Sequence, residues 1–444
     1  MKKIVNTLFL SLLLPLSVFA QGVDTVQVRR FMENPLGLLE GRVAGVEVIS
    51  SAGVPGLKPM VWMRGVRLHE SMAPLYIVDG IRVEDLSLLS PDDVASIKLC
   101  TDMSECLRYG SEAAYGTIII HTRGARREGL HAGYDFQGGA EWLRPQGKVL
   151  PDMSGTSFIG KHHLSLQYDR KWLSARTSFS YLDNDGPFNG RCDAFRRLGG
   201  VWNVEVHPWK WFRAGTSGNW GTGRIDNVAG YHNEEGMKSF QEGLRSQWRD
   251  LQQTSVRAWA EFTPLEGLYL RPYFDYSLWK EDWTAVRWEE EELRKGLGFV
   301  SDNGSRWRDG GIDVGYAHVF AGEHRLALDA GYRHVLYAPY RRELEGSFNE
   351  KYKGGFVWMD ESGFAEAARA AYQEWMGLPF EDRMAFFSDE EDFHIGGVKS
   401  NSPRYVWNDV SLLLSYQWLG RYDVCLGVME RWIRQSGFKF SAFI

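Results

Sequence analysis

The sequence of 444 residues lacks several features that would assign it to a common protein class. No internal run of about 18 apolar residues is present, which rules out a protein that crosses a membrane with helices. The formal net charge is −6, whereas a nucleic-acid-binding protein would usually show a basic surface. Only four cysteines occur and none form a Cys-x-x-Cys pair, so a redox site is not favoured.

Patterns typical of an enzyme are also missing. An outer-membrane lipase would need a Ser, a His and an acid or amide at one membrane level, and the sequence shows no such grouping. The adjacent His162 and His163 would point to opposite faces of a strand, which makes them a poor metal site. The acidic run 289–292 is more typical of a solvated loop than of a cation site. We therefore predict no enzymatic activity, no catalytic residues, no metal and no cofactor.

Aromatic side chains are abundant. They make up 14% of the residues and include 18 Trp, although the mean hydropathy is only −0.33. From Arg126 onward apolar and polar residues alternate with period two, as at Leu164, Leu166 and Tyr168. Such stretches run about 9–12 residues, long enough to cross a bilayer at a tilt, whereas strands of soluble sandwiches average about 5–6. The pattern predicts an antiparallel transmembrane β-barrel.

The connections between these stretches alternate between short and long, as in outer-membrane barrels whose short turns are periplasmic. Trp172, Trp209, Trp211 and Trp418 lie at the short turns, where an aromatic girdle is expected. The predicted short turns are 169–172, 207–211, 263–267, 321–324 and 418–420. The predicted long loops are 139–160, 183–195, 221–253, 280–309 and 338–403.

The first twenty residues predict a secretory signal peptide. Lys2 and Lys3 precede an apolar stretch, and Val18-Phe19-Ala20 fits a small-residue cleavage site. The mature chain would therefore enter an oxidising compartment. There Cys100 and Cys106, six residues apart, could close a small disulfide loop, with two buried thiols as the alternative.

Residues 34–124 show a different pattern of hydrophobic and polar residues. Five short β-type runs alternate with two helix-like pieces, 36–43 and 103–109. Asp79-Gly80 lies between apolar runs and predicts a two-residue hairpin turn. The expected strands are Val46–Ile49, Met60–Met63, Leu75–Val78, Ala95–Leu99 and Thr117–His121.

The order of these pieces resembles the plug domain of TonB-dependent outer-membrane transporters, most closely the SusC/RagA type. Four stretches carry the resemblance, together with Arg64-Gly65: 41–46, 74–80, 92–98 and 109–120. The plug-motif residues that this resemblance marks are Gly41, Arg42, Gly45, Arg64, Gly65, Asp79, Gly80, Tyr109, Gly110 and Gly116.

The resemblance also implies how the chain would work. In this family a short extended segment, the TonB box, precedes the plug and pairs as a strand with the energising partner. Its candidate here is Asp24, Thr25, Val26, Gln27 and Val28. The implied partners are the TonB–ExbB–ExbD complex, a SusD-like surface lipoprotein and outer-membrane lipid, and the implied cargo is a glycan or peptide.

Barrel size is where the sequence departs from this family, whose barrels have 22 strands. We expect about 12 to 14 strands after the plug. A naturally shortened relative, an incomplete or frameshifted gene, and a barrel completed by another chain would each explain this. The alternation at 438–444 resembles a last strand and favours a genuine end.

The expected organisation is therefore an α+β plug followed by an antiparallel barrel. We expect a signal peptide (1–20), an N-terminal segment (21–33), the plug (34–124) and a shortened or partial barrel (125–444). Two functions fit it: TonB-dependent nutrient uptake at the outer membrane, or a non-transporting remnant that acts there as a binding or scaffold protein.

Overall fold

The computed structural model describes most of the chain apart from its N-terminus and several connections. The described residues are 22–24, 33–43, 45–49, 55–63, 73–100, 109, 112–142, 156–186, 194–226, 245–288, 296–320, 324–348, 393–418, 422–433 and 439–442. The predicted signal peptide, Arg64, Gly65, Gly110 and Cys106 lie outside these residues.

The N-terminal part, called the plug below (residues 33–124 with β1), contains a five-stranded sheet in the order β1-β6-β7-β4-β5 and the separate hairpin β2–β3. Strands β4 and β7 pair in parallel, and the other pairs are antiparallel. Ile97, Ile118 and Ile120 are buried in its core. The elements are β1 (Gly22–Asp24), the 3₁₀ helix η1 (Pro35–Leu38), β2 (Val46–Ile49), β3 (Met60–Met63), β4 (Leu75–Val78), β5 (Ile81–Val83), η2 (Pro91–Asp93), β6 (Val94–Cys100) and β7 (Thr117–Thr122).

The strands expected in the plug are confirmed. β2, β3 and β4 have the predicted bounds, β6 extends the predicted run by one residue at each end, and β7 extends it by one residue at its C-terminal end. The turn between β4 and β5 has φ of 48° at Asp79 and 87° at Gly80, the positive angles of a type I′ turn. The piece expected at 36–43 is a single 3₁₀ turn instead, because Gly41 adopts φ of 65° and ends the helical path.

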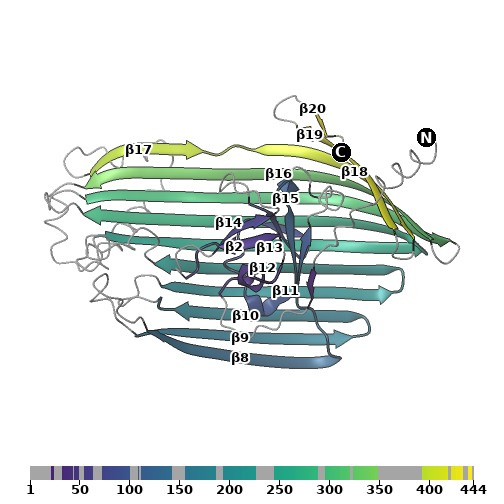
Figure 1. Cartoon of the computed structure of the whole chain (residues 1–444), viewed down its shortest axis with the longest axis horizontal. Helices are drawn as coiled ribbons and strands as arrows, with labels where there is room; N and C mark the ends of the chain where they lie inside the picture. The colour runs from purple at the N-terminus through teal and green to yellow at the C-terminus, as the bar shows by residue number, and fades with distance from the viewer. Residues whose placement is uncertain are drawn as a thin grey trace, which may run out of the picture.

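Within the described residues the C-terminal part is one sheet of 13 strands, called the wall below, and this number agrees with the expected 12 to 14. Sequential strands pair antiparallel, and β17 and β18 both pair with β16. Figure 1 shows the strands running side by side, with the plug against one face. The strands are β8 (Gly129–Trp142), β9 (Thr156–Arg170), β10 (Leu173–Asn184), β11 (Phe195–Trp209), β12 (Phe212–Asp226), β13 (Arg245–Leu265), β14 (Leu268–Trp288), β15 (Gly296–Phe320), β16 (His324–Phe348), β17 (Phe393–Asn401), β18 (Tyr405–Trp418), β19 (Tyr422–Ile433) and β20 (Lys439–Ala442).

Several wall strands are longer than the sequence indicated. β15 and β16 have 25 residues each, and β13 and β14 have 21. They take up much of the loops expected at 221–253 and 280–309. The short turns predicted at 169–172, 207–211 and 263–267 lie where expected, and most of 321–324 and 418–420 lies outside the described residues. The extensions carry many charges, which hide the alternation in the sequence. Ladder hydrogen bonds join backbone groups and therefore continue regardless of side-chain polarity.

The wall is open within the described residues. β8 pairs only with β9 and β20 only with β19, so the sheet has two edges (Figure 1). No described helix is long and apolar enough to span a membrane.

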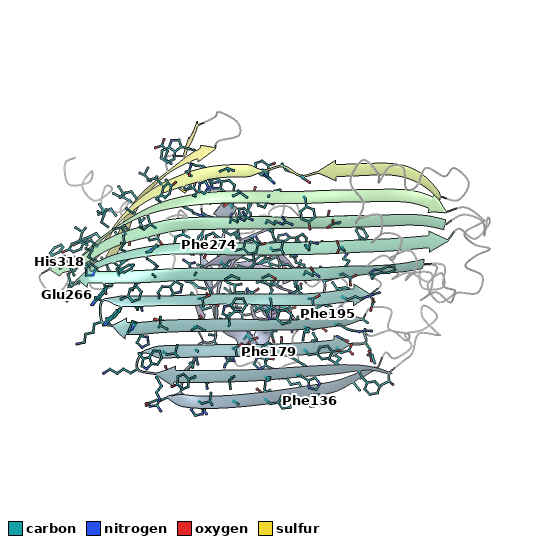
Figure 2. All side chains as sticks on the ribbon, turned by 180° about the vertical axis from the view of Figure 1, so that it is seen from behind. Phe136, Phe179, Phe195, Glu266, Phe274 and His318 are labelled. Atoms are coloured by element: carbon teal, nitrogen blue, oxygen red, sulfur yellow. The ribbon has the colours of Figure 1, made fainter. Side chains whose placement is uncertain are left out.

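The two faces of the wall differ in chemistry. The face turned away from the plug exposes large apolar side chains, among them Phe136, Phe179 and Phe274, which are labelled in Figure 2. Near the short turns Trp209 and Trp211 stack with their ring centroids 5.4 Å apart, as the predicted girdle requires. The opposite face is polar and receives the plug.

Candidate functional site

The strongest candidate site is the contact between the plug and the wall, and its first centre is Asp93 in η2. One carboxylate oxygen of Asp93 lies 2.8 Å from His163 Nε2 on β9 and accepts a 2.6 Å hydrogen bond from Ser178 Oγ on β10. Arg176 lies 3.7 Å from the same oxygen. The neighbouring Asp92 pairs with Lys161 of β9 at 2.5 Å. Two consecutive carboxylates of the plug thus hold two adjacent strands of the wall.

Electrostatics keeps Asp93 ionised in this buried position. Burial alone would raise the pKa of Asp93, but the hydrogen bonds and charges of His163, Ser178 and Arg176 lower the pKa overall. A buried carboxylate with several donors is costly to separate from them, because each partner would be left without its bond.

A second centre is Arg197 on β11, whose side chain is 1% exposed. Its guanidinium donates to three backbone carbonyls of the plug: Glu33 at 2.5 Å, Ser87 at 3.0 Å and Leu89 at 3.2 Å. The Glu33 carboxylate in turn accepts hydrogen bonds from the Asn184 side chain and, at 3.1 Å, from the Gly56 backbone. Arg197 therefore fixes two separate plug segments to one strand.

Beside Arg197, glycines let the plug approach the wall closely. Leu88 packs over Gly199, Gly221 and Gly223 of β11 and β12. A Cβ at Gly223 would lie 2.8 Å from Leu88 Cδ2, and one at Gly221 would lie 2.9 Å from Leu88 Cβ. Larger residues at these positions would push the plug away from the wall.

A third centre joins β5 of the plug to β15. Arg82 pairs with Glu112 at 2.6 Å and lies over the Trp307 ring at 4.3 Å from its centroid. The Glu84 carboxylate accepts hydrogen bonds from Trp307 Nε1 at 2.9 Å and from Ser305 Oγ at 3.2 Å. Burial would raise the pKa of Glu112, but the charge and hydrogen bond of Arg82, together with the charges of Arg431 and Arg333, lower the pKa overall.

Charged side chains continue this third centre across the wall, on the face that meets the plug. Cross-strand register places Arg257 opposite Asp275, Asp275 opposite Asp309, and Asp409 opposite both Arg333 and Arg431. Ion pairs link Arg333 to Asp309 at 2.5 Å and Arg431 to Asp409 at 2.7 Å. Arg431 also reaches Glu112 of the plug at 3.9 Å. The row thus offers the plug charges of both signs.

Among the predicted plug-motif residues, Asp79, Gly80 and Gly116 hold the geometry of the plug. Asp79 accepts hydrogen bonds from the Thr122 backbone at 2.8 Å and from Thr122 Oγ1 at 2.5 Å, which ties the β4–β5 turn to β7. A Cβ at Gly80 would overlap the Arg257 guanidinium, so this turn touches the wall. Gly116 has φ of 95° and lies against Met63.

The other predicted residues are more peripheral. Gly41, Arg42 and Gly45 are exposed, and Tyr109 packs beside Ala113 and the buried Cys100. Arg64, Gly65, Gly110 and Cys106 lie outside the described residues, so the Cys100–Cys106 disulfide stays a prediction. Of the candidate TonB box, Asp24 pairs with Ser96 in β1, and Thr25 to Val28 lie outside.

Sequence reasoning missed the wall residues of this site: Lys161, Ser178, Arg197 and Trp307. It did place His162 and His163 on opposite faces, and His163 is 4% exposed at the plug while His162 is exposed on the far face. Inward polar positions could have been found from alternation, but which of them meet the plug could not. Within the described residues no group of three or more His, Cys, Asp or Glu side chains forms a metal site.

Comparisons with known proteins agree with this architecture. The chain is 27% identical over 194 residues to the TonB-dependent receptor SusC of Bacteroides thetaiotaomicron, covering 34% of this chain and 19% of that protein. A TonB-dependent receptor of Formosa agariphila is 36% identical over 86 residues, which cover 19% of this chain and 8% of the relative. No protein-family model matches.

Solved structures resemble almost the whole chain. The RagAB peptide transporter superposes with a TM-score of 0.70 at 15% identity, covering 95% of this chain and 56% of that one. The unliganded ferric citrate transporter FecA gives a TM-score of 0.61 at 12% identity, covering 94% and 56%. The chain thus spans about half the length of these structures, and its matches cover a fifth or less of the curated relatives.

Proposed function

We propose, from its likeness to the SusC/RagA-type family of TonB-dependent receptors, that this outer-membrane chain takes part in energised import of a nutrient. In this proposal residues 34–124 are the plug, and the wall from 125 onward forms the passage that the plug obstructs. The TonB–ExbB–ExbD complex pulls on residues 24–28, and a SusD-like lipoprotein delivers a glycan or peptide from outside.

The observation that carries the proposal is the set of polar and charged contacts between plug and wall, which lie beside the apolar cluster around Leu88. Asp93, Arg197 and Glu84 are held there by hydrogen bonds and charges. If water enters and solvates both partners as the plug moves, the net cost of each exchanged bond to a charged group is about 1.5–3 kcal/mol, which is less than the cost of leaving a partner buried without its bond.

The position of β1 also supports a pulling mechanism. β1 is the edge strand of the plug sheet and pairs with β6 through only three residues, Gly22 to Asp24. Strand β6 follows directly on η2, which carries Asp92 and Asp93. Tension on the N-terminal segment would therefore reach the contacts of Asp92 and Asp93 with the wall through one short strand pairing.

The cargo class follows from the family likeness, and two classes remain. RagAB is a peptide transporter, and the alternating charges around Asp309 and Arg333 would suit the charged groups of a peptide. Trp307, Tyr337 and Tyr405 form an aromatic row beside the plug that would suit the apolar faces of sugars. Uptake assays with labelled oligosaccharides and oligopeptides would separate them.

Disulfide crosslinking tests the proposal directly. A cysteine at Gln27 and one in the C-terminal domain of TonB should form a crosslink whose yield rises when ligand is supplied. A cysteine at Arg42, exposed on the plug outside the TonB box, is the control and should give none. Equal yields at both positions would contradict energised import.

A non-transporting binding or scaffold protein is the alternative, and the two edges that the wall keeps within the described residues, at β8 and β20, would suit such a role. Such a protein would bind ligand without accumulating it inside the cell. It would also bind with the same affinity whether or not TonB is present.

A further inference from the structure

The face of the wall turned away from the plug carries an apolar belt whose height follows from the strand residues that it spans. On β16 the outward residues from His324 upward are Leu326, Leu328, Ala330 and Tyr332, and they are exposed. His324 stacks with Trp418 at the turn end, which marks the lower margin. Ten residues higher, His334 is the first strongly polar outward side chain on β16 above this run, and Leu336 follows it on the same face. At about 3.4 Å per residue and a tilt of 35–45°, this distance gives a belt about 25 Å high, the usual height for outer-membrane barrels.

The upper margin is polar on two adjacent strands. His334 Nδ1 lies 2.8 Å from Asn408 Oδ1, and the Tyr332 hydroxyl donates to the same oxygen at 3.0 Å. This cluster faces outward among exposed apolar residues such as Val410. Its polar groups are partnered within the cluster, as a position at the edge of the hydrocarbon region demands.

Two arginines project just beyond this margin. Arg308 and Arg306 on β15 share the outward face, lie two residues apart, and are both exposed. Arg308 is opposite Tyr276 and Leu336, and Arg306 is opposite Leu278 and Ala338, so each rises from apolar neighbours. Among the described residues no carboxylate forms an ion pair with either guanidinium.

Placement decides what these arginines can bind. An arginine at the bilayer midplane costs about 2–4 kcal/mol, whereas near the interface the cost falls to about 0–1 kcal/mol. At the margin a guanidinium lies level with headgroup phosphates, and its planar donors match phosphate oxygens in a bidentate geometry. Two such side chains stacked along one strand present a fork that a single anionic headgroup can span.

We propose that Arg306 and Arg308 form a binding site for the phosphate groups of an outer-leaflet lipid, and that this lipid anchors the wall at a fixed height. Acyl chains of the lipid would lie along Leu336, Tyr276 and the belt beneath them. The site is on the face away from the plug and does not depend on the proposed transport.

The test compares lipid retention by the full-length protein purified in detergent. Native mass spectrometry would count bound lipid A carrying both phosphates against the same lipid A with its phosphates removed. Wild type should retain the phosphorylated form at least about tenfold better, the order expected for two basic residues at an anionic surface. Arg306→Gln with Arg308→Gln should abolish this preference, and Arg306→Lys with Arg308→Lys should keep part of it.

The matched control is Arg170→Gln with Lys171→Gln, which removes the same charge at the opposite margin. This variant should keep the full preference, and heat-modifiable migration on gels confirms that each variant is folded. Equal retention of both lipids by wild type, or an equal loss in the control variant, would overturn the proposal. Competition by inorganic phosphate at equal concentration would also overturn it, because the site would then bind the ion rather than the lipid.

Discussion

The Asp93 carboxylate and the His163 imidazole meet at 2.8 Å across the boundary between plug and wall, with both side chains buried. Asp93 comes from the short η2 and His163 from the middle of β9, 70 residues later in the chain. Because Ser178 donates to the same oxygen, one carboxylate holds the plug to two strands at once.

Replacing Asp93 by alanine should loosen the plug without unfolding the wall. His163 and Arg176 would be left buried without their anion, and breaking such a buried pair typically costs about 3–5 kcal/mol. Cells carrying the variant should become permeable to large antibiotics such as vancomycin. Glu128→Gln, an exposed change in the plug-to-wall link, serves as the control and should leave permeability unchanged.

Acid should weaken the same contact. The pKa of Asp93 is lowered in the folded protein, so its stabilising effect is complete above the unfolded value of about 3.9 and is lost as pH falls through the lower folded value. Protection of the peptide 85–100 from hydrogen exchange, corrected for the intrinsic rate, should therefore stay constant between about pH 5 and 8 and fall at pH below about 4. In Asp93→Asn the protection should already be reduced at pH 7, and the Asp93-dependent acid step should be absent.

Arg196 and Arg197 allow a comparison between adjacent arginines on opposite faces. Arg197→Ala would leave the carbonyls of Glu33, Ser87 and Leu89 without their donor, at a cost of several kcal/mol. Arg196 forms an exposed ion pair with Asp183 at 3.6 Å, and exposed pairs contribute little. Arg196→Ala should therefore change the free energy of unfolding by less than about 1 kcal/mol. The temperature at which the folded band disappears on gels measures both. Equal shifts would contradict the role of Arg197.

Much of the fold could be predicted because it follows from local chemistry. Asp79-Gly80 predicts its turn because few other pairs tolerate two positive φ angles, and the alternation at Leu164 predicts which face of β9 is outward. Arg197 could not be placed in the same way. Its partners are backbone carbonyls of Glu33, Ser87 and Leu89, and a carbonyl has no signature in the sequence. The lengths of β13 to β16 were likewise hidden, because ladder pairing tolerates charged residues that look like a loop.

Gly80 and Gly41 separate backbone strain from contact with the wall. Both have positive φ, 87° and 65°, so alanine at either position costs about 1 kcal/mol in the backbone. Gly41→Ala meets nothing within 4 Å, whereas Gly80→Ala would overlap Arg257 and disturb its 3.5 Å pair with Asp275. The temperature of thermal unfolding should therefore be lowered more by Gly80→Ala than by Gly41→Ala. In an Arg257→Ala background the two glycine variants should become equivalent, and a persistent difference would show that the wall contact is unimportant.

The candidate TonB box, residues 24–28, offers the sharpest distinction between transport and scaffold. If residues 24–28 add as a strand to TonB, backbone donors matter more than side chains. Proline at Val26 removes one donor and fixes φ, so Val26→Pro should abolish both the Gln27 crosslink and uptake. Gln27→Ala keeps the backbone and should be nearly silent in uptake. Neither change touches β1, which ends at Asp24, so folding and ligand binding should match wild type in both variants. If uptake persists in Val26→Pro, residues 24–28 are not the TonB box. If wild type shows no uptake, the protein is a non-transporting scaffold.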